Sequence, residues 1–192
     1  MHPDDRRAQL LAAARRVFAR QGYHATSVAH ILAEAGVARG TFYNYFDSKR
    51  AVFGAVLEDI TGELIGVVRP IELSASLQEQ VRAAITHLVT ALVQPDVARI
   101  LFAAAVNVDA EGDAELRAFY DRAEARLAGA LTTGQGFGLV RTGSTALMAR
   151  CLIGMAKEPV FLAQLRDEPL DGAALIDQLF HLLTEGALHT PH

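Results

Sequence analysis

The chain has 192 residues, of which 51% are hydrophobic and 21% are charged; this composition excludes a disordered polymer and allows a full hydrophobic core. Its single cysteine excludes an intramolecular disulfide and is typical of a reducing compartment. Because the first residues are polar and no apolar run reaches the ~18 residues of a membrane span, we expect a cytoplasmic protein without a signal peptide.

The net charge of −4 is unevenly distributed along the chain. Residues 1–50 contain eight basic and four acidic residues, a net charge of +4, and the remainder contains ten and eighteen, a net charge of −8. A chance asymmetry is the simple alternative. A basic first quarter on an acidic body is what a DNA-binding segment needs, because neutralising phosphates drives affinity. The pattern therefore favours a nucleic-acid-binding N-terminal segment.

The first predicted helix runs from Arg6 to Gln21 and ends at Gly22. Its apolar stripe at helical spacing consists of Leu10, Leu11, Ala14, Val17 and Phe18. Arg6 and Arg7 are candidates for phosphate contacts. The later arginines are expected on an ordinary solvated face: Arg15, Arg16 and Arg20. Tyr23 in the following link is expected to pack on a small three-helix core.

Two short helices separated by a tight turn are predicted next. Apolar residues at helical spacing indicate the first of them over Ser27–Ala35. Thr26 or Ser27 can act as its N-cap, since a hydroxyl accepts an orphan backbone N–H. Gly36 follows at once and can take the left-handed conformation that stops a helix.

The second short helix carries Phe42 and Phe46, four residues apart, on an apolar face. Its outward face carries groups that bond phosphates and base edges: Arg39, Thr41, Tyr43, Asn44 and Tyr45. Gly40 lets the backbone come close to DNA, and Lys49 adds charge just beyond. Two short helices across a glycine turn predict a helix-turn-helix whose second helix fits the major groove.

The run from Gly36 to Lys49, Gly-Val-Ala-Arg-Gly-Thr-Phe-Tyr-Asn-Tyr-Phe-Asp-Ser-Lys, resembles the signature of the TetR family of bacterial repressors. The resemblance covers Arg6 to Val56. Ala38 departs from it, since the family often has Ser there; the loss removes a side-chain cap worth ~1 kcal/mol. The resemblance implies a DNA-binding domain over residues 1–50 and a helical ligand-binding and dimerisation domain over residues 51–192.

The resemblance also implies a double-stranded DNA operator as partner and a set of residues that contact it. These expected DNA-binding residues are Arg6, Thr26, Ser27, Arg39, Gly40, Thr41, Tyr43, Asn44, Tyr45 and Lys49. Among them, Tyr43 and Lys49 match family positions that grip the DNA backbone.

The rest of the chain reads as helices. Asp47-Ser48 offers a cap for a helix from Ser48 to about Val68, which Pro70 ends. Further helices are expected over Leu77–Val93, Val97–Val108, Asp113–Thr132, Ser144–Lys157 and Asp171–Leu188, with a segment holding Pro159 and Pro169 between the last two. No alternation typical of strands appears, so the predicted fold is all-α with about nine helices.

Aromatic and polar residues interleave in the predicted body: His87, Arg99, Phe102, Phe119 and Tyr120, together with Asn107, Arg122 and Phe137. A solid core with aromatic filler and a cavity with a few polar groups both fit this pattern. The resemblance implies a cavity for a small ligand, which we expect to be largely apolar or aromatic, with His87 or Arg99 as its polar partner.

Two apolar helix faces are wider than a lone surface helix requires. We expect them to form a two-fold homodimer interface of four helices, as the resemblance implies, and hence a near-palindromic operator. The interface residues are Leu147, Cys151, Leu152, Met155, Leu175, Leu179, Phe180 and Leu183, with Met148, Ile176 and Leu182 beside them.

Other constellations have simpler interpretations. The histidines lack metal-ligand spacing, so neither a metal nor a cofactor nor an enzyme is expected. Gly134, Gly136 and Gly138 follow no strand and are interpreted as a loop. Cys151 is expected to be a buried small hydrophobe rather than a redox sensor. The rivals of a ligand-released repressor are an activator, a ligand-independent DNA-binding protein, and a helical enzyme or interaction protein.

Overall fold

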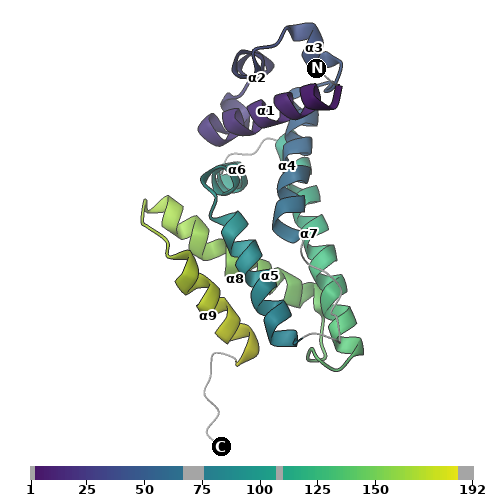
Figure 1. The fold of residues 1–192 in the computed structure, drawn as a ribbon, viewed down its shortest axis with the longest axis vertical. Helices are drawn as coiled ribbons and strands as arrows, with labels where there is room; N and C mark the ends of the chain where they lie inside the picture. Colours follow the sequence, from purple (N-terminus) through teal and green to yellow (C-terminus); the bar gives the residue numbers. More distant parts are fainter. Residues whose placement is uncertain (1–2, 67–75, 107–109, 186–192) are drawn as a thin grey trace, which may run out of the picture. The chain divides into compact units, whose positions relative to one another are not determined.

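The computed structural model describes residues 3–66, 76–106 and 110–185, and these residues form nine α-helices and no strand (Figure 1). The all-α prediction is confirmed. The helices are α1 (Pro3–Ala25), α2 (Val28–Ala35), α3 (Arg39–Tyr43), α4 (Lys49–Ile65), α5 (Leu77–Leu92), α6 (Pro95–Val106), α7 (Ala110–Gly136), α8 (Thr145–Leu165) and α9 (Gly172–Thr184). The predicted helix ends at Val68, Val108 and Leu188 lie outside the described residues, as does Pro70.

The chain divides into two compact units, Met1–Gly62 with Gln94–Asp121, and Glu63–Val93 with Arg122–His192. By packing, α6 and the first part of α7 therefore belong with the predicted helix-turn-helix. The predicted functional boundary at residue 50 falls inside the first unit, at the start of α4. The division into a DNA-binding domain and a ligand-binding domain at residue 50 therefore stays a prediction about function.

The core of the first unit joins α1 to α4 and α6. Phe18 and Tyr23 of α1 meet Phe53 of α4, with ring centroids 5.0 Å and 4.7 Å from the Phe53 ring, and all three side chains are buried. This confirms that Tyr23 packs in the core. The α1 helix also packs against α6 (Figure 1), where Arg15 Nε donates to Asp96 Oδ2 at 2.6 Å.

Two glycines set the entry and the turn of the helix-turn-helix. Gly22 has φ 75° and ψ 172° and interrupts α1 where the sequence predicted its end. Gly36 has φ 65° and ψ 35° and stops α2 in the left-handed conformation. A side chain is strained at such φ values, so glycine is the residue that fits both positions.

The prediction that Pro159 lies outside helix was wrong. The α8 helix continues through Pro159 to Leu165, although proline removes one backbone donor and crowds the preceding turn. Ala156 and Val160 on either side are buried. Burial of these two side chains compensates for the cost of proline, because packing of an apolar helix face outweighs the low helix propensity of one residue.

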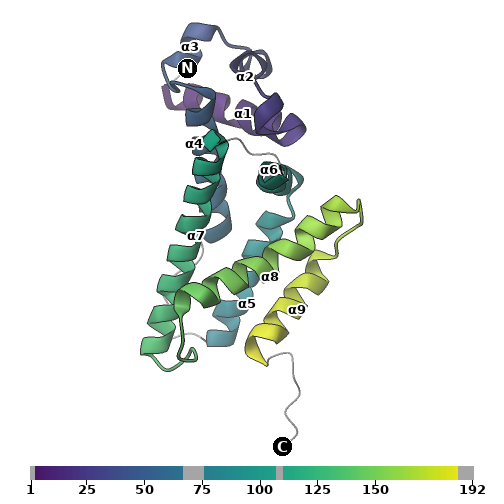
Figure 2. The ribbon, with the colours of Figure 1, turned by 180° about the vertical axis from the view of Figure 1, so that it is seen from behind.

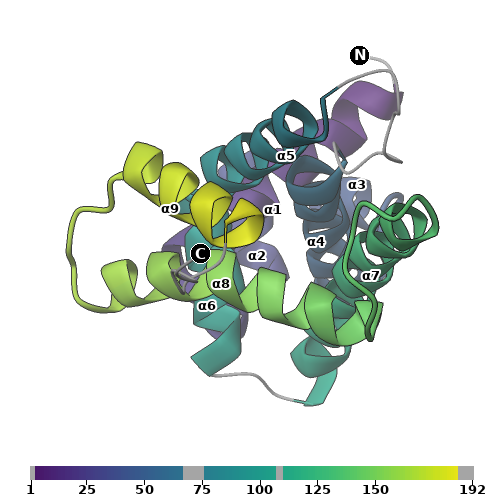
Figure 3. The same cartoon turned by 90° about the horizontal axis from the view of Figure 1, so that it is seen from below.

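The second unit is built on α5, α8 and α9. Seen in Figures 2 and 3, α9 lies beside α5 and follows α8 after a turn. Ile85, Val89 and Leu92 bury one face of α5, and Leu179 of α9 is also buried. Arg82 Nη1 donates to Asp177 Oδ1 at 2.7 Å, and its guanidinium lies 4.3 Å from the Phe180 ring centroid.

Among the described residues, no helix by itself is long and apolar enough to cross a membrane; α5 and the first part of α6 reach that length and composition only as a sharply bent pair.

Candidate nucleic-acid interface

The α2 helix begins in a reciprocal capping box. The Ser27 hydroxyl accepts the His30 backbone N–H at 3.2 Å, and His30 Nδ1 accepts the Ser27 backbone N–H at 3.3 Å. Two orphan donors of the first turn are thereby satisfied. The cap at Ser27 was predicted. The role of His30 was missed because the usual residue three positions after the cap is Glu or Gln.

The α3 helix is one short turn that packing holds in place. Phe42 is buried and its ring centroid lies 5.8 Å from that of Phe46. Ala38 at the N-cap position makes no side-chain hydrogen bond, as its departure from the Ser of the resembled signature predicts. The helix is therefore anchored through its aromatic face rather than through its N-terminal cap.

The opposite side of α3 is polar and open to solvent. Arg39, Gly40, Tyr43 and Asn44 are exposed, and Thr41 and Tyr45 are half-buried. The Arg39 guanidinium lies 5.7 Å from the Tyr43 ring centroid, a cation–π distance. The sequence prediction of an outward polar face therefore matches the exposure of these side chains.

Thr26 and Ser27 differ in what they can offer DNA. Thr26 is buried, and its hydroxyl donates to the Gly22 carbonyl at 2.6 Å. The Thr26 hydroxyl thus stabilises the link between α1 and α2 and faces no solvent. Ser27 is exposed at the first turn of α2.

The start of α1 is tied to the helix-turn-helix. Arg6 Nη1 donates to Gln9 Oε1 at 2.8 Å, and Gln9 Nε2 donates to the Ala35 carbonyl at 2.8 Å. The Arg7 guanidinium lies 5.4 Å from the Phe46 ring centroid. Arg7 thus lies against Phe46, three residues after α3, and Arg6 is linked to the end of α2 through Gln9.

The later arginines of α1 form ion pairs. The sequence predicted only that they lie on a solvated helix face. Arg16 Nε and Arg20 Nη2 donate to the two carboxylate oxygens of Glu34, at 2.7 Å and 3.0 Å. Hydrogen bonds from Arg16 and then Arg20 lower the pKa of Glu34. For Arg15 the prediction was wrong, because its side chain is only 20% exposed and binds Asp96.

Lys49 is the first residue of α4, and its ammonium group is held by Tyr23. Lys49 Nζ donates to the Tyr23 carbonyl at 2.9 Å and lies 4.2 Å from the Tyr23 ring centroid. The Tyr23 carbonyl also accepts the Thr26 backbone N–H at 3.3 Å. Lys49 thus joins the start of α4 to the link between α1 and α2.

A family model described as "Bacterial regulatory proteins, tetR family" matches residues 10–56. These residues include most of α1, all of α2 and α3, and the first part of α4. The chain belongs to the TetR family. The run from Gly36 to Lys49 predicts this membership, and the prediction is confirmed.

Similar proteins are transcriptional regulators. The "Fatty acid metabolism regulator protein" of Bacillus subtilis is 28% identical over 184 residues, 93% of each chain. The "HTH-type transcriptional activator FasR" of Mycolicibacterium smegmatis is 37% identical over 83 residues, 43% of this chain. The match spans 38% of FasR, and a match to the Bacillus subtilis regulator YfiR spans 28% of that protein.

Solved structures resemble this TetR-family chain along nearly its whole length. The transcriptional regulator FadR from Bacillus subtilis, solved in complex with stearoyl-CoA, has a TM-score of 0.79 and 25% identity, covering 95% of this chain and 99% of that one. A putative TetR-family regulator from Syntrophomonas wolfei has a TM-score of 0.83 at 22% identity, which supports the fold alone.

For this TetR-family regulator we expect Lys49→Ala to weaken all DNA binding without changing its salt dependence. The substitution removes a charged hydrogen bond and a cation–π contact within the protein, together about 2 kcal/mol of stability. The slope of log K against log salt should stay within about 0.3 of wild type in a titration from low to moderate salt. Arg6→Ala is the comparison, because Arg6 is a candidate phosphate contact, and its slope should fall by about 0.9. If the slope for Lys49→Ala falls by that amount, Lys49 contacts a DNA phosphate, as the resemblance to the TetR family implied.

The residues predicted to bind a ligand are distributed over both compact units. Phe102 of α6 and Phe119 of α7 are buried in the first unit, and Arg99 is exposed on α6. Tyr120 is half-buried beside Phe119, with ring centroids 5.1 Å apart, and burial raises the pKa of its hydroxyl. Asn107 lies outside the described residues.

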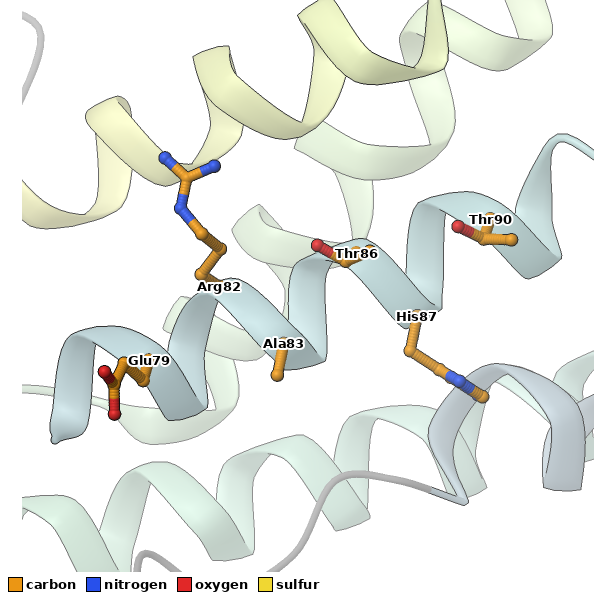
Figure 4. A pocket seen from close by; sticks show the side chains of 6 residues that line it. All are labelled: Glu79, Arg82, Ala83, Thr86, His87 and Thr90. Atoms are coloured by element: carbon orange, nitrogen blue, oxygen red, sulfur yellow. The ribbon is translucent and has the colours of Figure 1, made fainter. Parts of the chain in front are cut away.

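His87 belongs to the second unit, where it lines an open hollow on α5 with Glu79, Arg82, Ala83, Thr86 and Thr90 (Figure 4). The other four predicted ligand residues are not part of this hollow. His87 Nε2 bonds the Glu63 carbonyl in the last turn of α4, so its ring satisfies an orphan acceptor at a helix end.

The predicted interface residues on α8 and α9 have different exposures. Leu147 is 60% exposed, and Leu182 and Leu183 are 40% and 41% exposed. Six others are half-buried, namely Met148, Leu152, Met155, Leu175, Ile176 and Phe180. Leu179 is 6% exposed and belongs to the core of its own unit.

Cys151 is exposed, so the expectation that it is buried within the chain was wrong. Its helix turns that side outward, while Ala149 and Ala156 face inward. Across the described residues, no group of three His, Cys, Asp or Glu side chains could hold a metal ion.

Proposed function

We propose that this TetR-family regulator binds a near-palindromic operator as a homodimer and represses transcription until a small ligand releases it. The observation that carries the proposal is the exposed polar face of α3, opposite an anchored aromatic face, on a basic N-terminal segment. Arg39, Thr41 and Asn44 read base edges, and Tyr43 and Tyr45 contact the DNA backbone. Arg6, Ser27 and the Gly40 backbone add contacts. The protein acts in the cytoplasm without catalysing a reaction.

The proposed ligand is a long-chain acyl-CoA. The support is the likeness over 93% of both chains to a fatty acid metabolism regulator and the likeness of fold to FadR, which was solved with stearoyl-CoA. Phe119 and Tyr120 pack ring against ring, and Phe102 of α6 is buried as well; such apolar aromatic side chains suit an acyl chain. An apolar ligand of this kind agrees with the expectation from sequence.

The proposed homodimer is held by three exposed leucines of α8 and α9, namely Leu147, Leu182 and Leu183. An apolar side chain that is open in one subunit becomes favourable to bury against a second copy. The two-fold axis places two recognition helices in successive major-groove faces, and this geometry requires the near-palindromic operator.

Leu147→Arg should therefore convert the dimer to monomers without unfolding the subunit, because Leu147 is 60% exposed. An arginine there would be buried without a partner on association. Leu165→Arg is the matched control, since Leu165 is 67% exposed at the far end of the same helix and outside the proposed interface. Sedimentation velocity at micromolar concentration measures both. A Leu147→Arg variant that sediments as wild type would contradict the interface, as would a monomeric wild type.

The function is tested by footprinting the DNA next to the protein's own gene with and without stearoyl-CoA, with free CoA as the control. We expect one protected palindrome, and saturating stearoyl-CoA should weaken binding about 100-fold, which is ~2.7 kcal/mol of coupling. By reciprocity, operator DNA should weaken stearoyl-CoA binding by the same factor in a calorimetric titration.

Each other outcome selects a rival. Protection that stearoyl-CoA leaves unchanged would indicate ligand-independent binding or a different ligand. FasR is an activator, so a fall in transcription on deleting the gene would indicate activation. Absence of any sequence preference would favour a helical interaction protein or an enzyme.

A further inference from the structure

His30 lies at the first turn of α2, where the capping box of a helix usually has Glu or Gln. Its Nδ1 atom accepts the Ser27 backbone N–H at 3.3 Å, while the Ser27 hydroxyl accepts the backbone N–H of His30 at 3.2 Å. A histidine thus occupies a capping position where Glu or Gln, whose protonation does not change near neutral pH, is usual.

A second donor points at the same nitrogen. Gln21 Nε2 lies 2.7 Å from His30 Nδ1 and also donates to the Ala25 carbonyl at 2.9 Å. An amide NH₂ has two hydrogens, so one group can make both bonds. His30 Nδ1 therefore accepts from two N–H donors, and the ring must be neutral with its proton on Nε2. The ring joins α1, the link and the start of α2.

Protonation removes this arrangement. A hydrogen on Nδ1 would face two N–H donors, so both hydrogen bonds would be lost. Histidine is the side chain whose ordinary titration falls between pH 5 and 8. A Glu or Gln in the same position would not change over that interval.

The charged groups of the surrounding elements remain constant over the same interval. Arg16 and Arg20 of α1 pair with Glu34 of α2, and these arginines lower the pKa of Glu34, which keeps it ionised. Arg39 of α3 lies over the Tyr43 ring. His24 in the last turn of α1 is the other histidine in these elements, and its ring centroid lies 5.6 Å from that of Tyr23.

We propose that neutral His30 is a positioning residue that fixes the first turn of α2 for DNA, and that its protonation weakens operator binding. The inference rests on the proposed operator function. Loss of the hydrogen bonds that His30 Nδ1 accepts would reduce affinity about fivefold, because the DNA complex must then reorder the turn. The direction is diagnostic, since added positive charge alone would strengthen attraction to phosphates.

The test measures operator affinity by fluorescence anisotropy from pH 8 to pH 5.5 at constant ionic strength. We expect wild type to weaken about fivefold at the low end. His30→Gln restores a capping-box residue that does not titrate, so its affinity should not fall as the pH is lowered. His24→Gln is the matched control and should keep the wild-type profile. A His30→Gln variant that retains the wild-type pH profile would overturn the proposal.

A second measurement needs no DNA. Nitrogen chemical shifts of the imidazole rings report which ring nitrogen carries the proton, and at pH 8 the His30 proton should be on Nε2. A proton on Nδ1 at that pH would overturn the proposal whatever the DNA result. If the ring behaves as proposed and no DNA fragment binds at any pH, the network is supported and the operator function fails.

Discussion

Phe53→Ala is expected to destabilise the first compact unit by about 3–5 kcal/mol, because it removes a buried aromatic ring and leaves a cavity. Phe53 is 1% exposed and its ring contacts those of Phe18 and Tyr23. These three rings are what packs α4 against α1. Operator binding should be lost together with stability, since Tyr23 also carries the carbonyl and the ring that hold Lys49.

Urea unfolding followed by circular dichroism measures this effect. Glu58→Ala on the exposed side of the same helix is the control and should change stability by less than about 0.5 kcal/mol. Phe53→Leu keeps most of the volume and should cost less than Phe53→Ala. A loss below about 1 kcal/mol for Phe53→Ala would show that the ring cluster is not what holds α4.

Arg39→Ala and Asn44→Ala are expected to relax base preference, each at one position of the operator half-site. A bidentate Arg–guanine or Asn–adenine pair contributes about 1–3 kcal/mol of discrimination. Both side chains are exposed on α3, and neither change removes core packing. Competition between operator variants with single base-pair changes measures the preference directly.

Two further variants separate base reading from general affinity. Lys49→Ala should weaken all operator variants alike, since Lys49 bonds the protein itself. Tyr43→Phe keeps the ring beneath Arg39 and should preserve the discrimination that Arg39 provides. If Arg39→Ala or Asn44→Ala retains the wild-type ranking of operator variants, that residue is not a base reader.

The sequence by itself determined the order of the helices, the cap at Ser27 and the family. Ser27 as a cap, Gly22 and Gly36 as stops, and the pair Phe42 and Phe46 were all readable from the chain. These signals act over a few residues, because a cap, a left-handed glycine and an i,i+4 pair each involve one turn of helix. The outward polar face of α3 followed from the same periodicity.

The tertiary structure alone decided which polar side chains are free and which are used internally. Arg15 binds Asp96, 81 residues away, and Lys49 binds the Tyr23 carbonyl, 26 residues away. Such partners depend on how helices pack, and no local pattern encodes that. For the same reason the continuation of α8 through Pro159 was missed, because burial of neighbouring side chains outweighs the local preference of proline. Leu179 and Cys151 share an apolar pattern in sequence, and only packing made one buried and the other exposed.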